Sequence, residues 1–168
     1  MAKVAFVLAD DFEDSEFKVP YDRIREAGHD VTVVGMTAGA SVKGKKGTET
    51  FTIDAAPQDV DAGEFQALVV PGGYSPDKLR TDEGIVSLVR KIAGEDRPIA
   101  AICHAGSLLI EADLVDGRRV TSWPSIRTDL ENAGAEWEDR EVVVDGNIIT
   151  SRKPDDLDAF TAAILKRL

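Results

Sequence analysis

Cys103 and His104 are the residues of this chain best suited to chemistry. They stand between an apolar run of strand length, residues 98–102, and a helical pattern over residues 105–112. A strand that turns directly into a helix at a reactive residue is a nucleophile elbow, which raises that side chain above the sheet edge. The partial positive charge at the helix start predicts a lowered pKa for the Cys103 thiol. Cys103 is the only cysteine. It could be a small buried apolar residue, but the elbow and the adjacent His104 favour a nucleophile.

A thiolate that attacks a carbonyl carbon needs N–H donors for the developing oxyanion and a group that moves protons. The backbone N–H of His104 is one candidate donor, and that of Gly73, after another apolar strand, is the second. Glu13 is the candidate acid, because a carboxyl group buried near a thiolate has a raised pKa and can donate a hydrogen bond to sulfur. Two simpler readings stay open: Glu13 as an ordinary acid of a first helical turn, and Gly72-Gly73 as only a tight turn.

The elements that would position these residues alternate along the chain. Apolar strands are predicted at residues 3–9, 31–36, 67–70 and 98–102, with helices after the first, third and fourth and a loop with a short strand after the second. This order predicts a three-layer α/β/α sandwich around a mostly parallel, flavodoxin-like sheet, formed by residues 1–168 as a single domain. In such folds sites lie at the carboxyl ends of strands, where Glu13, Gly73 and Cys103 all fall.

Three local features are also predicted. The first helix should end at Gly28 and kink or restart at Pro20. A hairpin is expected over residues 141–150 with its turn at Asp145-Gly146. A short peripheral strand is expected over residues 48–53.

Composition and charge narrow the functional classes. The formal net charge is −11, with 31 acidic residues against 20 Lys and Arg. Such a surface repels phosphate backbones and anionic lipids, so we expect no nucleic-acid or membrane partner. The small cluster of Lys43, Lys45 and Lys46 is interpreted as a solvated loop. The N-terminal apolar run ends in two acids and is interpreted as a strand rather than a signal peptide. Together with a single reduced thiol, this predicts a cytoplasmic protein.

Cofactor sites have no support in the sequence. One cysteine and two histidines lack the spacing of a zinc site. Gly72-Gly73 is not a dinucleotide fingerprint, and no phosphate-binding G-x-x-x-x-G-K motif occurs. We therefore expect neither metal nor cofactor.

Motifs along the whole chain resemble the PfpI intracellular-protease and protein-deglycase family. They are F-E-D-S-E, V-V-P-G-G-Y-S-P-D, A-I-C-H-A-G, T-S-W-P-S-I-R-T-D-L-E-N-A-G-A-E-W and V-V-V-D-G-N-I-I-T-S-R-K-P. The wider superfamily shares its fold with class I glutamine amidotransferase domains. The resemblance implies that Cys103 is the nucleophile, with His104 beside it and Glu13 as the acid that bonds the thiol. It also implies an oxyanion hole formed by the N–H groups of Gly73 and His104.

The same resemblance implies an assembly. In this branch an acid of the P-G-G-x-x-P-E segment of a neighbouring subunit completes the site beside His104. The segment here ends in Asp77, one methylene shorter than the usual Glu. The expected partner is thus a second copy of the chain, as a homodimer or a hexamer. Trp123 and Gly72 are expected to contact substrate. The elbow departs from the common C-H-G-P by reading C-H-A-G, which changes the helix entry but not the nucleophile.

Three functions are compatible with this set of residues. The first is a cofactor-free glyoxalase or deglycase, in which the thiolate attacks methylglyoxal, glyoxal or an early glycation adduct. The second is a cysteine peptidase with a Cys103–His104–Asp77 triad that acts on unfolded protein. The third is a non-enzymatic oxidative-stress sensor or chaperone that works through oxidation of Cys103, since exposed thiols of low pKa oxidise preferentially.

Overall fold

The computed structural model describes all 168 residues and is built on a six-stranded sheet in the order β2-β1-β5-β6-β10-β9. The strands are β1 (Lys3–Val7), β2 (Asp30–Val34), β5 (Ala67–Val70), β6 (Ile99–Ile102), β9 (Val143–Asp145) and β10 (Ile148–Ser151). Every neighbouring pair is parallel except β10 with β9. The predicted, mostly parallel sheet is confirmed.

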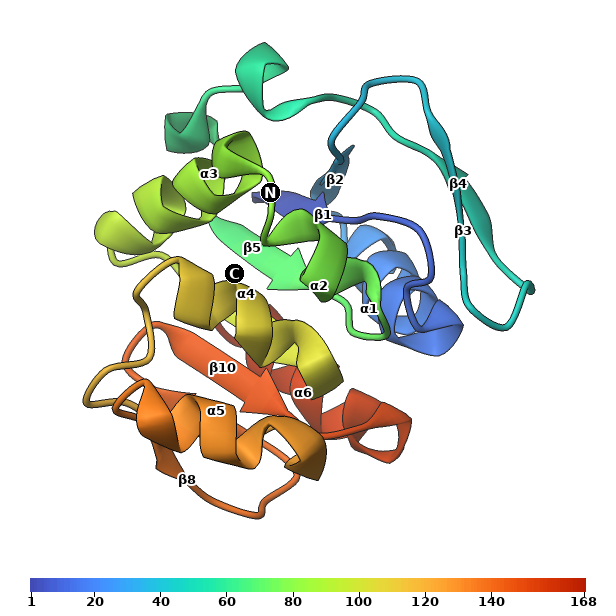
Figure 1. Cartoon of the computed structure of the whole chain (residues 1–168). Coiled ribbons are helices and arrows are strands. Elements are labelled where there is room, and N and C mark those ends of the chain that lie inside the picture. The colour runs from blue at the N-terminus through green and yellow to red at the C-terminus, as the bar shows by residue number, and fades with distance from the viewer.

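Helices cover both faces of this sheet. They are α1 (Asp14–Glu26), α2 (Ser75–Leu79), α3 (Glu83–Gly94), α4 (Gly106–Glu111), α5 (Arg127–Asn132) and α6 (Leu157–Leu165). Figure 1 shows α3, α4 and α5 in front of the sheet and α1 and α6 behind it. The buried apolar side chains divide in the same way into two clusters, one on each face. The three-layer α/β/α architecture is therefore as predicted.

The alternation of side chains along β1 explains why the central strands read as unbroken apolar runs. Val4 and Phe6 point to the core beneath α1 and α6, whereas Ala5 and Val7 point to the opposite core. All four are fully buried, so both faces of the strand must be apolar.

One predicted alternative is excluded and one predicted detail is wrong. Of the kink or restart expected at Pro20, the restart is excluded, because α1 is a single helix through this residue. Pro20 is buried on the same face as Ile24, and this packing offsets the missing N–H. The hairpin turn comes one residue later than expected, at Gly146-Asn147, since Asp145 still pairs with Ile148. Asp145 stays in the strand because its carboxylate accepts the Arg119 N–H at 2.8 Å.

Two small sheets complete the fold. The antiparallel pair β3 (Ser41–Lys43) and β4 (Thr50–Thr52) forms a hairpin that extends beyond the main sheet in Figure 1. The expected strand at residues 48–53 is thus present as β4. The parallel pair β7 (Arg119–Val120) and β8 (Glu136–Trp137) was not predicted as a sheet, because each strand has only two residues. None of the helices has the length and apolar character required to cross a bilayer.

Candidate active site

Three loops meet at the carboxyl edge of the sheet, because β1, β5 and β6 are neighbours there. The loops after β1 and β5 are joined by backbone hydrogen bonds. The N–H of Tyr74 donates to the carbonyl of Asp11 at 2.8 Å, and the N–H of Glu13 donates to that of Gly72 at 3.1 Å. The convergence of strand ends expected from the sequence is therefore present, and it places the loops beside the residue that follows β6.

Cys103 lies on a sharp turn between β6 and α4, as expected for a nucleophile elbow. Its φ is +65°, in the left-handed region that residues with a Cβ rarely adopt. The side chain is 7% exposed and packs on the α1 and α6 side of the sheet. The backbone N–H groups of His104 and Gly73 both act to lower the pKa of the thiol. The two N–H groups identified in the sequence thus act on the charge of one sulfur atom.

The net pKa of Cys103 nevertheless differs from the sequence prediction. Burial, and next the negative charge of Glu16, raise the pKa of this thiol to about 12 and outweigh the two N–H groups. The helix that follows is short and begins with a turn of 3-10 helix, so it supplies little of the expected stabilisation of the thiolate. In the single chain, ionisation of Cys103 depends on relief of burial or on neutralisation of Glu16.

Glu16, rather than Glu13, is the acid beside the thiol. Its side chain is fully buried, and one carboxylate oxygen, Oε1, accepts the N–H of Gly72 at 3.0 Å. The other, Oε2, has no hydrogen-bond partner. A Cβ on Gly72 would collide with both Glu16 Oε1 and the Cβ of Cys103, so the two side chains flank this glycine. Burial, and next the charge of Glu13, raise the pKa of Glu16 to about 8, so the group is mostly neutral at pH 7.

Glu13 has a different position from the one predicted. It is the N-cap of α1, where its carboxylate accepts the N–H of Glu16 at 3.0 Å and pairs with the Lys46 ammonium at 2.7 Å. Burial acts to raise the pKa of Glu13, but Lys46, the Ser15 hydroxyl and the Glu16 N–H together hold it below its usual value. An ionised cap that is already paired is poorly suited to donate a hydrogen bond to sulfur.

A signal in the sequence could have distinguished the two acids. Glu16, Pro20 and Ile24 are four residues apart, which places them on one face of a helix. All three are buried in α1. Glu13 precedes the helix at the N-cap position, where acidic side chains fold back onto the backbone of the first turn.

The glycine pair after β5 is confined by its neighbours. Gly73 has φ +77°, and a Cβ there would lie 2.5 Å from both the Asp11 carbonyl and the Glu13 N–H nitrogen. The N–H of Gly72 is used by Glu16, and Gly72 is buried. Gly72 therefore separates Glu16 from Cys103 beneath the site, and the substrate contact predicted for it finds no support here.

His104 and Asp77 line the same cavity of about 440 Å³, together with Tyr74 and Arg80. The His104 ring makes no hydrogen bond or ion pair within the chain, and Asp77 is exposed and likewise without a partner. Burial, and next the charge of Lys45, lower the pKa of His104, which leaves the imidazole neutral at pH 7. His104 and Asp77 of one chain thus line the same cavity, but no hydrogen bond connects them.

The lysine residues after β3 are exposed, as the sequence suggested, and the backbone of their loop is hydrogen-bonded to Asp14. The buried Asp14 carboxylate accepts the N–H groups of Lys46, Thr48 and Glu49 at 2.9–3.0 Å, and the Thr48 hydroxyl at 2.9 Å. The loop therefore has a fixed path next to the site. Within it, the Lys45 ammonium lies 6.0 Å from the centroid of the Tyr74 ring.

Trp123 is beside the elbow, and it is 41% exposed. Its backbone N–H donates to the carbonyl of Cys103 at 3.2 Å. Its indole is absent from the lining of the His104 cavity, so a contact with substrate remains a prediction.

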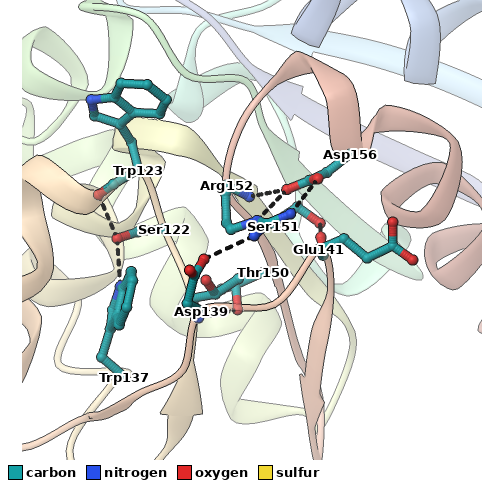
Figure 2. Close-up of polar contacts among 10 residues, drawn as sticks. Ser122, Trp123, Trp137, Asp139, Glu141, Thr150, Ser151, Arg152 and Asp156 are labelled. Carbon is teal, nitrogen blue, oxygen red and sulfur yellow. Dashed lines mark hydrogen bonds and ion pairs between the residues drawn. The ribbon is translucent and has the colours of Figure 1, made fainter.

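Strand β10 borders the elbow strand, with Ser151 opposite Ile102. Figure 2 shows Arg152, the next residue, directed at two carboxylates: Asp156 at 2.9 and 3.0 Å and Asp139 at 2.8 Å. These hydrogen bonds raise the pKa of Arg152 and fix the end of β10. The charge of Arg152 is thus satisfied within the protein. No group of three His, Cys, Asp or Glu side chains is arranged to hold a metal ion.

Comparison with known proteins gives matches over almost the entire chain. The sequence profile of the DJ-1/PfpI family matches residues 2–167. The chain is 48% identical over 167 residues to protein/nucleic acid deglycase 2 of Escherichia coli, covering 99% of this chain and 97% of that protein. It is 47% identical to general stress protein 18 of Bacillus subtilis with the same coverage. It also superimposes with a TM-score of 0.98 on a two-domain protein of Anabaena variabilis containing DJ-1/ThiJ/PfpI-like and ferritin-like domains. That structure is 41% identical, and the match covers 99% of this chain and 48% of that one.

Proposed function

The chain belongs to the DJ-1/PfpI family, and on this basis we propose that it is a cofactor-independent cysteine deglycase with glyoxalase activity. Its substrates are methylglyoxal, glyoxal and early glycation adducts. The observation that supports this most strongly is the Cys103 elbow, where a left-handed backbone turn carries the single thiol and the N–H groups of Gly73 and His104 favour its charged form. A relative that is 48% identical over its full length is named a deglycase.

The reaction with methylglyoxal proceeds in three balanced steps. The Cys103 thiolate forms a bond to the aldehyde carbon, and the carbonyl electron pair moves to oxygen, which takes up a proton as the hemithioacetal forms. A proton then moves from that carbon to the neighbouring carbonyl carbon by way of an enediol, which gives a lactoyl thioester. Water attacks the thioester, lactate leaves, and the thiol is restored. No redox cofactor is needed, because one carbon is oxidised as its neighbour is reduced.

The roles of the residues follow from their charge states. The N–H groups of Gly73 and His104 bind the oxyanion of each addition step. The neutral imidazole of His104 moves the proton between the two carbons. Glu16, with its pKa raised to about 8 by burial and the charge of Glu13, carries a proton at neutral pH, and its unpartnered Oε2 is the proposed proton donor to the Cys103 sulfur during the reaction.

Two copies of the chain form the complete site in this proposal. His104 and Asp77 line one cavity but neither has a hydrogen-bond partner, and an imidazole that acts as a base is normally oriented by a third group. Asp77 of a neighbouring copy would supply this contact. The assembly is a homodimer, or a hexamer built from such dimers, and the single reduced thiol suits the cytoplasm.

Glycated proteins and small carbonyls are the proposed substrates, in preference to nucleic acids. The net charge of −11 disfavours binding to a phosphate backbone. The Escherichia coli relative is named for action on both protein and nucleic acid, so a glycated nucleotide belongs among the test substrates. A cavity of about 440 Å³ beside His104 is suited to a small ligand rather than to an extended peptide.

Formation of lactate from methylglyoxal without glutathione tests the function. Wild type should form lactate, and Cys103→Ala should reduce the rate to the uncatalysed level. Ser87→Ala, which alters a hydroxyl of α3 away from the elbow, should leave it unchanged. Equal rates for wild type and Cys103→Ala would refute the proposal. Cleavage of unfolded peptides without lactate formation would instead identify a peptidase.

A further inference from the structure

The segment that follows β7 contacts the strained turn at Cys103 through a backbone hydrogen bond. The backbone N–H of Trp123 donates to the Cys103 carbonyl at 3.2 Å. A residue with a Cβ and φ +65° persists only where its surroundings hold it there. The path of the chain at Trp123 therefore bears directly on the orientation of the thiol.

Ser122 fixes this path. Its hydroxyl donates to the carbonyl of Trp123 at 2.8 Å and accepts the indole N–H of Trp137 at 3.0 Å. Figure 2 shows Ser122 between the two tryptophans, with the indole of Trp123 turned away from that of Trp137. Ser122 is fully buried. Because an indole can only donate and a hydroxyl can do both, the direction of the two bonds is determined.

The outer end of this chain of bonds is anchored as well. Trp137 lies on β8 and packs at the edge of the core beneath α3 and α4. The Arg127 guanidinium lies 4.8 Å from the centroid of its ring. On the other side of Ser122, the N–H of Thr121 donates to the Thr150 hydroxyl at 2.9 Å. A continuous path thus runs from β8 through Ser122 and Trp123 to Cys103.

We propose that Ser122 and Trp137 are positioning residues for the Cys103 thiol. Their hydrogen bonds hold the backbone of Trp123 against the elbow and fix where its exposed indole lies. Neither residue touches the sulfur, so both act through Trp123. The inference rests on the proposed function for its kinetic consequences, whereas the reactivity of the thiol tests it independently.

Three variants separate positioning from general stability. Ser122→Ala removes the hydroxyl, and Trp137→Phe removes the donor while keeping a large ring. Ser122→Thr retains the hydroxyl and is the rescue variant. When the hydrogen bonds of Ser122 are lost, the backbone of Trp123 no longer holds the turn at Cys103. The sulfur then moves away from the N–H groups of His104 and Gly73.

Two readouts are measured at a temperature where each variant is folded by circular dichroism. The first is the rate of alkylation of Cys103 by iodoacetamide, which reports on one atom because the chain has no other cysteine. The second is kcat and KM for methylglyoxal. Ser122→Ala and Trp137→Phe should each lower the alkylation rate and kcat by about tenfold, and Ser122→Thr should restore both.

Alkylation and kcat at wild-type values in both Ser122→Ala and Trp137→Phe would overturn the inference. So would losses that only follow a reduced fraction of folded protein. If wild type itself forms no lactate, the proposed function fails. The alkylation rates then still decide whether Ser122 and Trp137 position the thiol.

Discussion

At the scale of single residues, Glu16 links the protonation of the site to the stability of the fold. Burial, and next the charge of Glu13, raise its pKa from 4.5 to about 8. Between these two values the folded protein holds a proton that the unfolded chain has released. The stabilisation is complete below about pH 4.5 and is lost as the pH rises through about 8. We expect the free energy of unfolding of wild type to fall across this window by a few kcal/mol relative to Glu16→Gln.

Urea denaturation at about pH 5 and about pH 8 measures this difference. Glu26→Gln, which removes an exposed carboxylate from the same helix, is the control and should keep the wild-type dependence on pH. A Glu16→Gln variant with the same pH dependence as wild type would contradict the prediction.

Lys45 is the cation that acts on the thiol. Burial and the charge of Glu16 raise the pKa of Cys103, whereas the positive charge of Lys45 lowers it. Lys45→Gln should therefore raise the pKa of Cys103 and slow its alkylation at a fixed alkaline pH. The pH dependence of alkylation measures the shift. Lys43→Gln makes the same charge change on the same hairpin and should have a smaller effect. Equal effects in the two variants would show that only the net charge matters.

The sequence identified those site residues whose positions follow from the pattern of neighbouring residues. Cys103, His104 and Gly73 lie at the ends of apolar strands, so their place at the sheet edge followed from the strand pattern alone. Glu13 and Glu16 belong to one short motif. The choice between them depended on where α1 begins, and a helix boundary inferred from sequence alone is uncertain by a similar number of residues. The pKa of Cys103 could not be predicted from the sequence, because it depends on burial in the packed structure.

At the scale of elements, the carboxylate of Asp14 is the main side-chain anchor of the loop that joins β3 to β4. Asp14 accepts four hydrogen bonds from Lys46, Thr48 and Glu49. Asp14→Ala removes all four bonds and leaves the loop's donors, on exposed or half-buried residues, without a protein partner. We expect a loss of about 2 kcal/mol in the free energy of unfolding and a lower rate of lactate formation, because Lys45 and Lys46 lose their fixed positions.

Chemical denaturation and proteolysis of the loop measure the two parts of this prediction. Asp22→Ala is a matched control, because it removes a carboxylate of the same helix that pairs only with Lys18 near the surface. It should cost less than about 0.5 kcal/mol. An Asp14→Ala loop that resists proteolysis as well as wild type would show that other contacts hold it.

Longer elements were predicted from the sequence more accurately than short ones. Strand β5 has the predicted bounds, since its apolar run ends at Pro71 and Gly72. Strands β3 and β8 are too short for periodicity to reveal. The hairpin turn was misplaced by one residue because the bond between Asp145 and the N–H of Arg119 joins segments far apart in the sequence.

At the scale of the whole molecule, the order of strands and helices was sufficient to predict the sandwich. Alternation of buried strands with helices leaves few topologies other than a parallel sheet covered on both faces. How a second copy would sit against His104 cannot be derived from the same pattern. That arrangement depends on surface complementarity, and the surface positions of a helix or strand are weakly constrained by the fold.

The assembly proposed here has a consequence that a mixture of two inactive proteins can test. Cys103→Ala lacks the nucleophile, and Asp77→Ala lacks the acid that would orient His104 of a neighbour. In a mixed dimer the Asp77→Ala chain keeps Cys103 and His104, and the other chain supplies an intact Asp77. After subunit exchange, we expect lactate formation to recover to roughly a quarter of the wild-type rate, because half of the dimers are mixed and each holds one complete site.

Subunit exchange itself is verified by differently tagged chains, so that a failure to mix is not read as a failure of complementation. Asp77→Glu provides a second measurement, since its longer side chain should reach His104 at least as well and keep or increase kcat. If exchanged mixtures are no more active than Asp77→Ala alone, the acid acts within its own chain or not at all. His104 would then have to be oriented by a group of its own subunit, and Asp129 and Asn132, which line the same cavity, become the residues to substitute.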